Sequence, residues 1–309
     1  MDQNPDPMIT ATAKRDVRAL NRAEHAQQAN DVKDKLPSDL KHHADLASEK
    51  GASSWLSVIP IGTHGFQLHK GDFRDALRLR YNWQLSNIPK TCNCGANFSV
   101  DHAMICHMGG FPTIRHNEIR DITASLLTEV CHNVATEPPL QPLTGKLFSA
   151  RSVNTSNHAR PDIRARGFWN NHQDAFFDVR VFYPNAPSNR SGDAYRRHEQ
   201  AKKREYGQRV REIERGVFTP LVLSTWGGMG KEAATFYKRL ADLLSSKRQN
   251  PYPAVMGWLR CRLSFASIRS AIMCIRGSRS SLHRPVYMDN INLVSQEGRV
   301  PPPEYIIHL

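Results

Sequence analysis

The fold of this chain is decided by two stretches, Ala159-Arg-Pro-Asp-Ile-Arg-Ala-Arg-Gly167 and Ala175-Phe-Phe-Asp-Val-Arg-Val-Phe-Tyr183. In both, apolar residues recur between charged ones over a short length bounded by turn residues, which is typical of β-strands. The polar segment 169–174 separates them. We therefore expect two antiparallel strands joined as a hairpin.

Helices are expected on both sides of this hairpin. Apolar residues in 116–135 recur at helical spacing. Downstream we expect a charged helix at 193–215, a buried strand at 217–225, a helix at 231–247 and a basic amphipathic helix at 258–276. The order helix–strand–strand–helix–strand–helix predicts an α/β (α+β) fold in which helices flank a mixed β-sheet.

A compact set of metal-ligand residues precedes the first of these helices. Its spacing is Cys-x-Cys-x7-His-x3-Cys, from Cys92 and Cys94 to His102 and Cys106. Thiolates and imidazole are the ligands that zinc prefers, and the glycine after the second cysteine favours a tight turn. We predict a structural Zn²⁺. The alternative is buried free cysteines near a surface histidine.

The charge of the chain indicates a polyanionic partner. Its 309 residues carry a formal net charge of +13, spread along the whole length. Nucleic acid is the commonest polyanion, although a basic surface can also serve solubility alone. Hydrophobic runs are too short to span a membrane, and the polar N-terminus is unlike a signal peptide. We expect an intracellular protein that binds no membrane.

Two aspartates of the predicted hairpin suit a magnesium site. Asp162 and Asp178 lie in its two strands, and a hairpin can bring both carboxylates to one end. Mg²⁺ prefers oxygen ligands of this kind. Asp178 also lies in an apolar run, where a charge without a partner is costly. The alternative is that each aspartate forms an ion pair, with Arg160 and Arg180 respectively.

The expected helix at 193–215 supplies a cation for phosphoryl chemistry. Its apolar stripe should pack on the sheet, and helical geometry puts Lys202 about 40° from that stripe. Lys202 is therefore the first choice for a catalytic lysine, Lys203 the second, and Glu199 a further carboxylate. The alternative, a solvated charged helix, applies well to Lys203.

Two residues near the start of the first helix have open roles. Glu118 is a candidate third metal ligand, and His116 a candidate contact to the scissile phosphate. Each is equally well explained as a capping or surface residue.

Arginines offer further phosphate contacts. Arg74, Arg78 and Arg80 fall near one face of a short predicted helix, and the helix at 258–276 is basic enough to lie along DNA. A solvated helix face explains the first three equally well.

In their order along the chain, these motifs resemble the C-terminal part of non-LTR retrotransposon proteins, which carry a zinc knuckle and a restriction-like endonuclease. The resemblance covers about 91–230. Its landmarks are the CCHC cluster, Arg115-His116-Asn117, Arg160-Pro161-Asp162, Asp178 and Lys202-Lys203-Arg204-Glu205-Tyr206.

The resemblance implies a PD-(D/E)xK core that nicks target DNA with Mg²⁺, with Asp162 and Asp178 as metal ligands and Lys202 or Lys203 as the lysine. The usual lysine two residues after the second acid is Arg180 here. No Asp-Asp pair occurs, so we expect no reverse transcriptase domain. The implied partners are DNA, element RNA and a separate reverse transcriptase, in the nucleus.

Two functions follow from this reading, a Mg²⁺-dependent DNA endonuclease or a non-catalytic nucleic-acid-binding remnant of the same element. The predicted segments are a flexible or helical lead at 1–50, a helical linker region at 51–90, the zinc knuckle at 91–115, the endonuclease core at 116–250, a basic C-terminal helix at 251–283 and a loose tail at 284–309.

Overall fold

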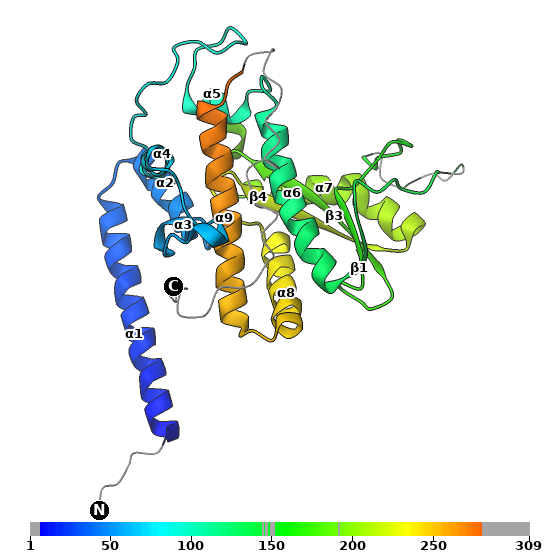
Figure 1. Cartoon of the computed structure of the whole chain (residues 1–309), viewed down its shortest axis with the longest axis horizontal. Coiled ribbons are helices and arrows are strands. Elements are labelled where there is room, and N and C mark those ends of the chain that lie inside the picture. The colour runs from blue at the N-terminus through cyan, green and yellow to red at the C-terminus, as the bar shows by residue number, and fades with distance from the viewer. Residues whose placement is uncertain (1–6, 144, 146–147, 149–151, 191, 280–309) are drawn as a thin grey trace, which may run out of the picture.

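A four-stranded mixed sheet forms the centre of the computed structural model, which describes residues 7–143, 145, 148, 152–190 and 192–279 (Figure 1). In spatial order the strands are β1 (His132–Thr136), β2 (Ile163–Arg166), β3 (Asp174–Phe182) and β4 (Val217–Ser224). The pairs β1–β2 and β2–β3 are antiparallel, and the pair β3–β4 is parallel. The tail predicted at 284–309 lies outside the described residues.

The predicted hairpin is confirmed by β2 and β3, which pair antiparallel with Ile163 opposite Phe177. The first strand is shorter than expected, because β2 begins at Ile163 rather than at 159. Pro161 has no backbone N–H to give to a ladder, which explains the late start. Asp162 therefore lies immediately before the strand.

Strand β1 was not predicted. The expected helix at 116–135 is α6 (Phe111–Val130), which begins after Gly110 in the left-handed region and ends five residues early. The chain then turns into β1, where Asn133 has a φ of 49° and the register with β2 shifts. Residues 132–136 form a strand because they pair with β2, some thirty residues further along the chain. Helical spacing alone therefore assigned these residues wrongly to a helix.

Helices cover both faces of the sheet, as predicted. Alternation along β3 sends Ala175, Phe177 and Val179 into the main core, and Phe176 and Phe182 into smaller clusters on the opposite face. The main core is covered by α6, α8 (Lys231–Arg248) and α9 (Tyr252–Arg276), and the other face by α7 (Ala194–Lys202) with the π-helical turns Lys203–Gly207 and Val210–Glu214.

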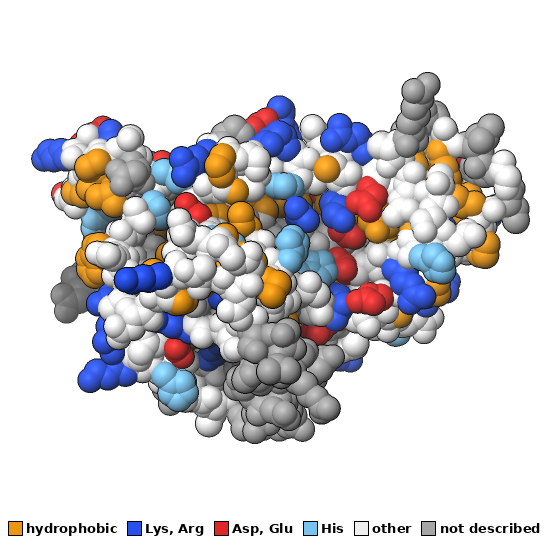
Figure 2. Space-filling view, turned by 90° about the horizontal axis from the view of Figure 1, so that it is seen from above, with side chains coloured by type: hydrophobic (Ala, Val, Ile, Leu, Met, Phe, Trp, Pro, Cys, Tyr) orange, Lys and Arg blue, Asp and Glu red, His pale blue; other side chains and the backbone are white. Residues whose placement is uncertain are grey.

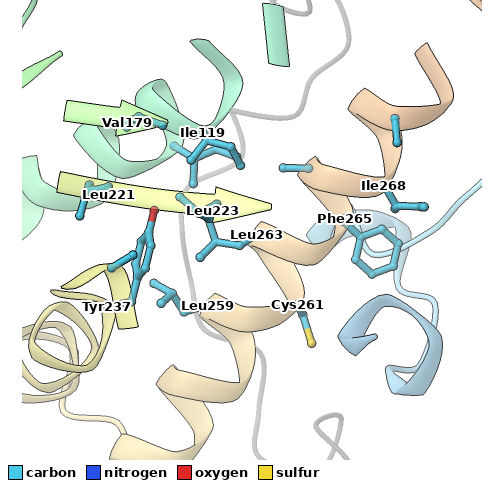
Figure 3. Close-up of a cluster of buried hydrophobic side chains, with 14 of the residues drawn as sticks. Ile119, Val179, Leu221, Leu223, Tyr237, Leu259, Cys261, Leu263, Phe265 and Ile268 are labelled. Carbon is cyan, nitrogen blue, oxygen red and sulfur yellow. The ribbon is translucent and has the colours of Figure 1, made fainter. Parts of the chain in front are cut away.

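The long helix α9 is the centre of the main core, not a surface helix. Figure 3 shows Leu259 and Leu263 of α9 facing Leu223 of β4 and Tyr237 of α8. Most residues of α9 are buried, because the helix packs against α6, α8, α3 and α4. The expectation that it lies along DNA is therefore not met.

The arginines of α9 bind the protein itself. Arg276 forms a bidentate ion pair with Asp75, with N···O distances of 2.6 and 2.9 Å. Arg269 donates to the carbonyls of Gly65 and Gln67 at 2.5 and 2.7 Å. Arginine suits such carbonyl and carboxylate contacts because its guanidinium carries five donors in a fixed plane.

The N-terminal part is helical and contributes to the same core. Trp55, Phe66 and Leu79 belong to the main cluster. Much of the lead predicted as flexible or helical at 1–50 is helical; α2 begins at Ser38 after Pro37, and α1 extends away from the body (Figure 1). None of the described helices has the length and apolarity needed to cross a bilayer. The elements here are α1 (Pro7–Asp34), α2 (Ser38–Ser48), α3 (Ser54–Ser57), η1 (Gly62–His64) and α4 (Lys70–Arg80).

Candidate zinc cluster and acidic site

Four side chains of the predicted CCHC motif converge on one point. The ligand atoms of Cys92, Cys94, His102 and Cys106 all lie within 4.8 Å of one another. The Cys92 and Cys106 sulfurs are 3.8 Å apart, and Cys94 Sγ is 3.3 Å from His102 Nε2. This group can bind a metal ion such as zinc.

A tight turn followed by a short helix builds the cluster. The Cys92 N–H donates to Ala96 O at 2.9 Å, and Gly95, at a φ of +89°, donates to Cys92 O at 2.8 Å. This turn lets two thiols one residue apart face the same point. Helix α5 (Val100–Ile105) then presents His102, whose backbone N–H is capped by the Ser99 hydroxyl at 3.1 Å.

The thiols of the cluster influence each other's protonation. Burial alone would raise the pKa of Cys92, but hydrogen bonds from the Cys94 backbone and the His102 side chain lower it to about 6. Burial and the neighbouring Cys92 raise the pKa of Cys106. Ionisation of one thiol thus opposes ionisation of its neighbour. A bound cation would remove this opposition, since it stabilises all of the thiolates together.

The cluster is anchored on the main core through two buried arginines. Arg115, only 4% exposed, donates to Met104 O at 3.3 Å. The Arg279 guanidinium lies 5.0 Å from the Phe98 ring centroid and 4.9 Å from that of Phe111. Arg115 belongs to the Arg-His-Asn landmark, and in this structure it supports the CCHC segment.

The two aspartates face each other across the hairpin. One step beyond the pair Ile163 and Phe177, the antiparallel register sets Asp162 opposite Asp178. Asp178 lies on the face covered by α7, whereas Asp162, just before β2, is contacted by His116 of α6 and lies near enough for its charge to act on Asp178. Asp162 Oδ2 accepts the Val179 N–H at 2.6 Å, and His116 Nε2 lies 2.9 Å from Asp162 Oδ1.

Asp178 is buried and paired with a lysine. It is 3% exposed, and its Oδ2 lies 2.9 Å from Lys202 Nζ. Burial and the charge of Asp162 raise the pKa of Asp178 to about 7, against the opposing effect of Lys202. Among the described residues, neither of the alternative ion pairs, with Arg160 or Arg180, is formed.

Only one of the two candidate lysines reaches the aspartates. Lys203 turns to Glu232 of α8, where its Nζ lies 2.5 Å from Oε1. Glu199, the further carboxylate, accepts the Glu232 N–H at 2.9 Å and so caps the start of α8. Lys202 therefore belongs to the site, whereas Lys203 and Glu199 support the packing of α7 on α8.

Glu118 does not join the aspartates. Its charge acts instead on Arg262 and Arg269 of α9, where it opposes the lowering of their pKa values by burial. His116 and Glu118 are two residues apart, so they lie on nearly opposite sides of α6. Glu118, the expected third metal ligand, thus lies on the side of α6 that faces α9 and not on the side from which His116 contacts Asp162.

A carboxylate that sequence reasoning missed lies beside the site. Glu205 Oε2 is 3.2 Å from Lys202 Nζ, and its charge contributes to the raised pKa of Asp178. Its spacing of three residues from Lys202 was the available signal, since such pairs share a helix face.

The face of the molecule in Figure 2 shows acidic side chains gathered in a band next to histidines, lysines and arginines. No protein-family model and no curated protein matches the chain.

Proposed function

We propose that this protein is a Mg²⁺-dependent DNA endonuclease with a PD-(D/E)xK, restriction-like core, related to the endonucleases of non-LTR retrotransposons. The observation that carries the proposal is the opposed pair Asp162 and Asp178 with Lys202 on the second carboxylate. A mixed sheet flanked by helices agrees with such a core.

The donor set fits magnesium. Asp162 and Asp178 offer hard oxygen ligands whose charges interact, and Mg²⁺ is commonly held by one or two carboxylates together with substrate phosphate. Asp178 is costly as a buried anion, and a cation would offset that cost. When bound, the ion would supply an activated water and neutralise charge on the phosphate.

The residues around the pair have separable tasks. The Val179 N–H and His116 hold the two oxygens of Asp162, which fixes that carboxylate in place. Lys202 favours the ionised form of Asp178, against the effect of burial, and supplies a positive charge where negative charge develops on phosphate. His116 is thus a positioning residue for Asp162.

A plasmid-nicking assay tests the proposal. We expect wild type to nick supercoiled DNA with Mg²⁺ and not without it, and both Asp162→Ala and Asp178→Ala to lose at least about 10³-fold in rate. Asp174→Ala, at the partly exposed start of β3, is the matched control and should cleave normally. Equal nicking by all four proteins would refute the proposal.

A non-catalytic nucleic-acid-binding protein is the second candidate. It is favoured by the fact that Lys202 and His116 each lie 2.9 Å from one of the aspartates without a metal. Under this alternative, wild type binds DNA with a strong salt dependence and shows no Mg²⁺-dependent cleavage.

The proposal extends to partners and place of action. The net charge of +13 supports DNA as substrate and element RNA as a further ligand. A nick would prime synthesis by a separate reverse transcriptase, which places the activity in the nucleus. We assign the Zn²⁺ of the CCHC cluster a structural role, because all four of its ligands come from protein.

A further inference from the structure

A hollow lies beyond the end of the strand that carries Asp178. It is a cavity of about 490 Å³ that lies between α2, the segment after α4, α5 and the residues that follow β3 and β4. Tyr183 on its wall comes five residues after Asp178, so it lies about 17 Å further along the chain. The cavity shares no residue with the acidic site, and its volume is that of a small-ligand site.

The place of the cavity in the fold favours ligand binding. Strands β3 and β4 are parallel, and Tyr183 and Trp226 come directly after their carboxyl ends. In α/β proteins, ligands bind preferentially in the crevice outside the carboxyl ends of parallel strands, because loops there carry side chains on a rigid base.

The charged groups on the wall favour an anion. Arg78 and Arg190 contribute two permanent positive charges, against one carboxylate, Asp101. That carboxylate already accepts the Tyr183 hydroxyl at 2.5 Å. Arg78 donates to Ser86 Oγ, and Arg190 donates through Nε to Asn185 O at 3.0 Å. Guanidinium groups held in this way suit a phosphate.

A buried amide organises two imidazoles on the same wall. Asn185 is 6% exposed; its Oδ1 lies 3.1 Å from His42 Nε2 and its Nδ2 lies 3.3 Å from His43 Nε2. Because one side chain holds both rings, their orientation is set before any ligand arrives. Such preorganisation is characteristic of binding sites.

The rim adds an aromatic platform. Trp83 is 60% exposed, and one face of its indole stacks on Tyr81, with ring centroids 5.0 Å apart and an interplanar angle of 27°. A large exposed indole supported from behind can stack a nucleobase. Inorganic phosphate would leave this platform unused, whereas a nucleotide uses the ring and the guanidinium groups together.

We infer that this cavity binds one nucleotide unit, with the base on Trp83 and the phosphate at Arg78 and Arg190. The unit is either a free mononucleotide or an unpaired nucleotide of a single strand. This binding does not rest on the proposed cleavage, because none of the groups that carry it belongs to the acidic site.

The test is binding by the full chain without added Mg²⁺, so that cleavage plays no part. Tryptophan fluorescence and anisotropy are measured with deoxyadenosine monophosphate, inorganic phosphate, a single-stranded oligonucleotide of about twelve residues and the matching duplex. We expect quenching by the mononucleotide or by the single strand. If the single strand binds more tightly than the mononucleotide, the bound unit is a nucleotide of a single strand. If the two bind with comparable affinity, the unit is a free mononucleotide.

Two exposed substitutions and two matched controls locate the site. Trp83→Leu and Arg190→Ala should each weaken binding about tenfold, and Arg190→Ala should also reduce its salt dependence. Tyr252→Leu and Arg211→Ala, also exposed, should bind as wild type does, and circular dichroism checks folding. Unchanged binding in both cavity variants would overturn the inference, as would a preference for duplex or equal affinity for inorganic phosphate.

Discussion

The Cys–His cluster, which can bind a metal ion, and the acidic site, for which we propose one, are built in opposite ways. The four ligands of the first come from a segment of fifteen residues, Cys92 to Cys106. The second combines α6, β2, β3 and α7, whose residues His116 and Lys202 are 86 positions apart. A local site can be recognised from spacing, whereas a site assembled by the sheet depends on register and helix orientation.

Removing zinc should have the largest effect, because the thiols of the CCHC cluster would lose the cation that stabilises them together as thiolates. Cys94 is exposed, so Cys94→Ser removes a ligand without opening the core. We expect loss of one bound Zn²⁺ by elemental analysis and a loss of unfolding free energy of up to about 10 kcal/mol.

Cys131→Ser is the control for this prediction, since its thiol is partly exposed and lies outside the cluster. It should retain the zinc and nearly all of the stability. A Cys94→Ser protein that keeps both its zinc and its melting temperature would show that the cluster is not a structural zinc site.

The acidic site should respond to pH in the metal-free protein. Asp178 titrates at about 7 when folded and near its ordinary 3.8 when unfolded, so the folded state binds more protons between these values. Stability should therefore fall as the pH rises from about 4 to about 7, by about 4 kcal/mol. Denaturant titrations across this range measure the slope.

Two comparisons sharpen the pH prediction. Asp178→Asn should lose this slope, whereas Asp174→Asn on the same strand should keep it. Mg²⁺ should stabilise the wild type most above pH 7, because it binds the ionised carboxylate. If the wild type and Asp178→Asn show identical pH dependence, Asp178 does not titrate in this range.

The adjacent lysines at the end of α7 and the start of the following π-helical turn distinguish a role in catalysis from a contribution of charge alone. Lys202→Met should lower the rate of nicking by about 10²–10³-fold, or about 3 kcal/mol, because its Nζ lies on Asp178. Lys203→Met removes the same charge one residue later, where the partner is Glu232. Its rate should stay within about threefold, and the reverse order of effects would exchange the two assignments.

The smallest effect on the rate of nicking is expected at Glu118, which lies on the side of α6 away from His116. Glu118→Gln should leave nicking within about threefold, less than 1 kcal/mol, because its charge acts on arginines of α9. Glu205→Gln should lower the rate more, since Glu205 orients Lys202. Single-turnover rates at saturating Mg²⁺ compare the two, and a larger loss for Glu118→Gln would return it to the site.

Several elements could be predicted because their signals are local. The hairpin follows from alternation and a polar turn, and the convergence of Cys92, Cys94, His102 and Cys106 follows from their spacing. The preference for Lys202 over Lys203 came from the angle of each to the apolar stripe of one helix. In the structure Lys202 lies on Asp178, and Lys203 pairs with Glu232 instead.

Other elements could not be predicted because distant partners decide them. β1 exists through pairing with β2, although its residues also fit the end of a helix. The arginines of α9 resemble a DNA-binding face until α4 and the segment after α3 supply Asp75, Gly65 and Gln67 as acceptors. Glu118 and His116 are neighbours in the sequence that the packing of α6 separates.

The sequence by itself determined the periodicity of the strands and helices, the Cys–His cluster and the two candidate aspartates, because these signals extend over a few residues. The tertiary structure decided which of the charged side chains meet. It sets Asp162 opposite Asp178 through strand register, brings Lys202 to them through α7, and turns Glu118 toward α9. The physical reason is that a charge interacts with whatever lies within a few ångströms in space, whatever its distance along the chain.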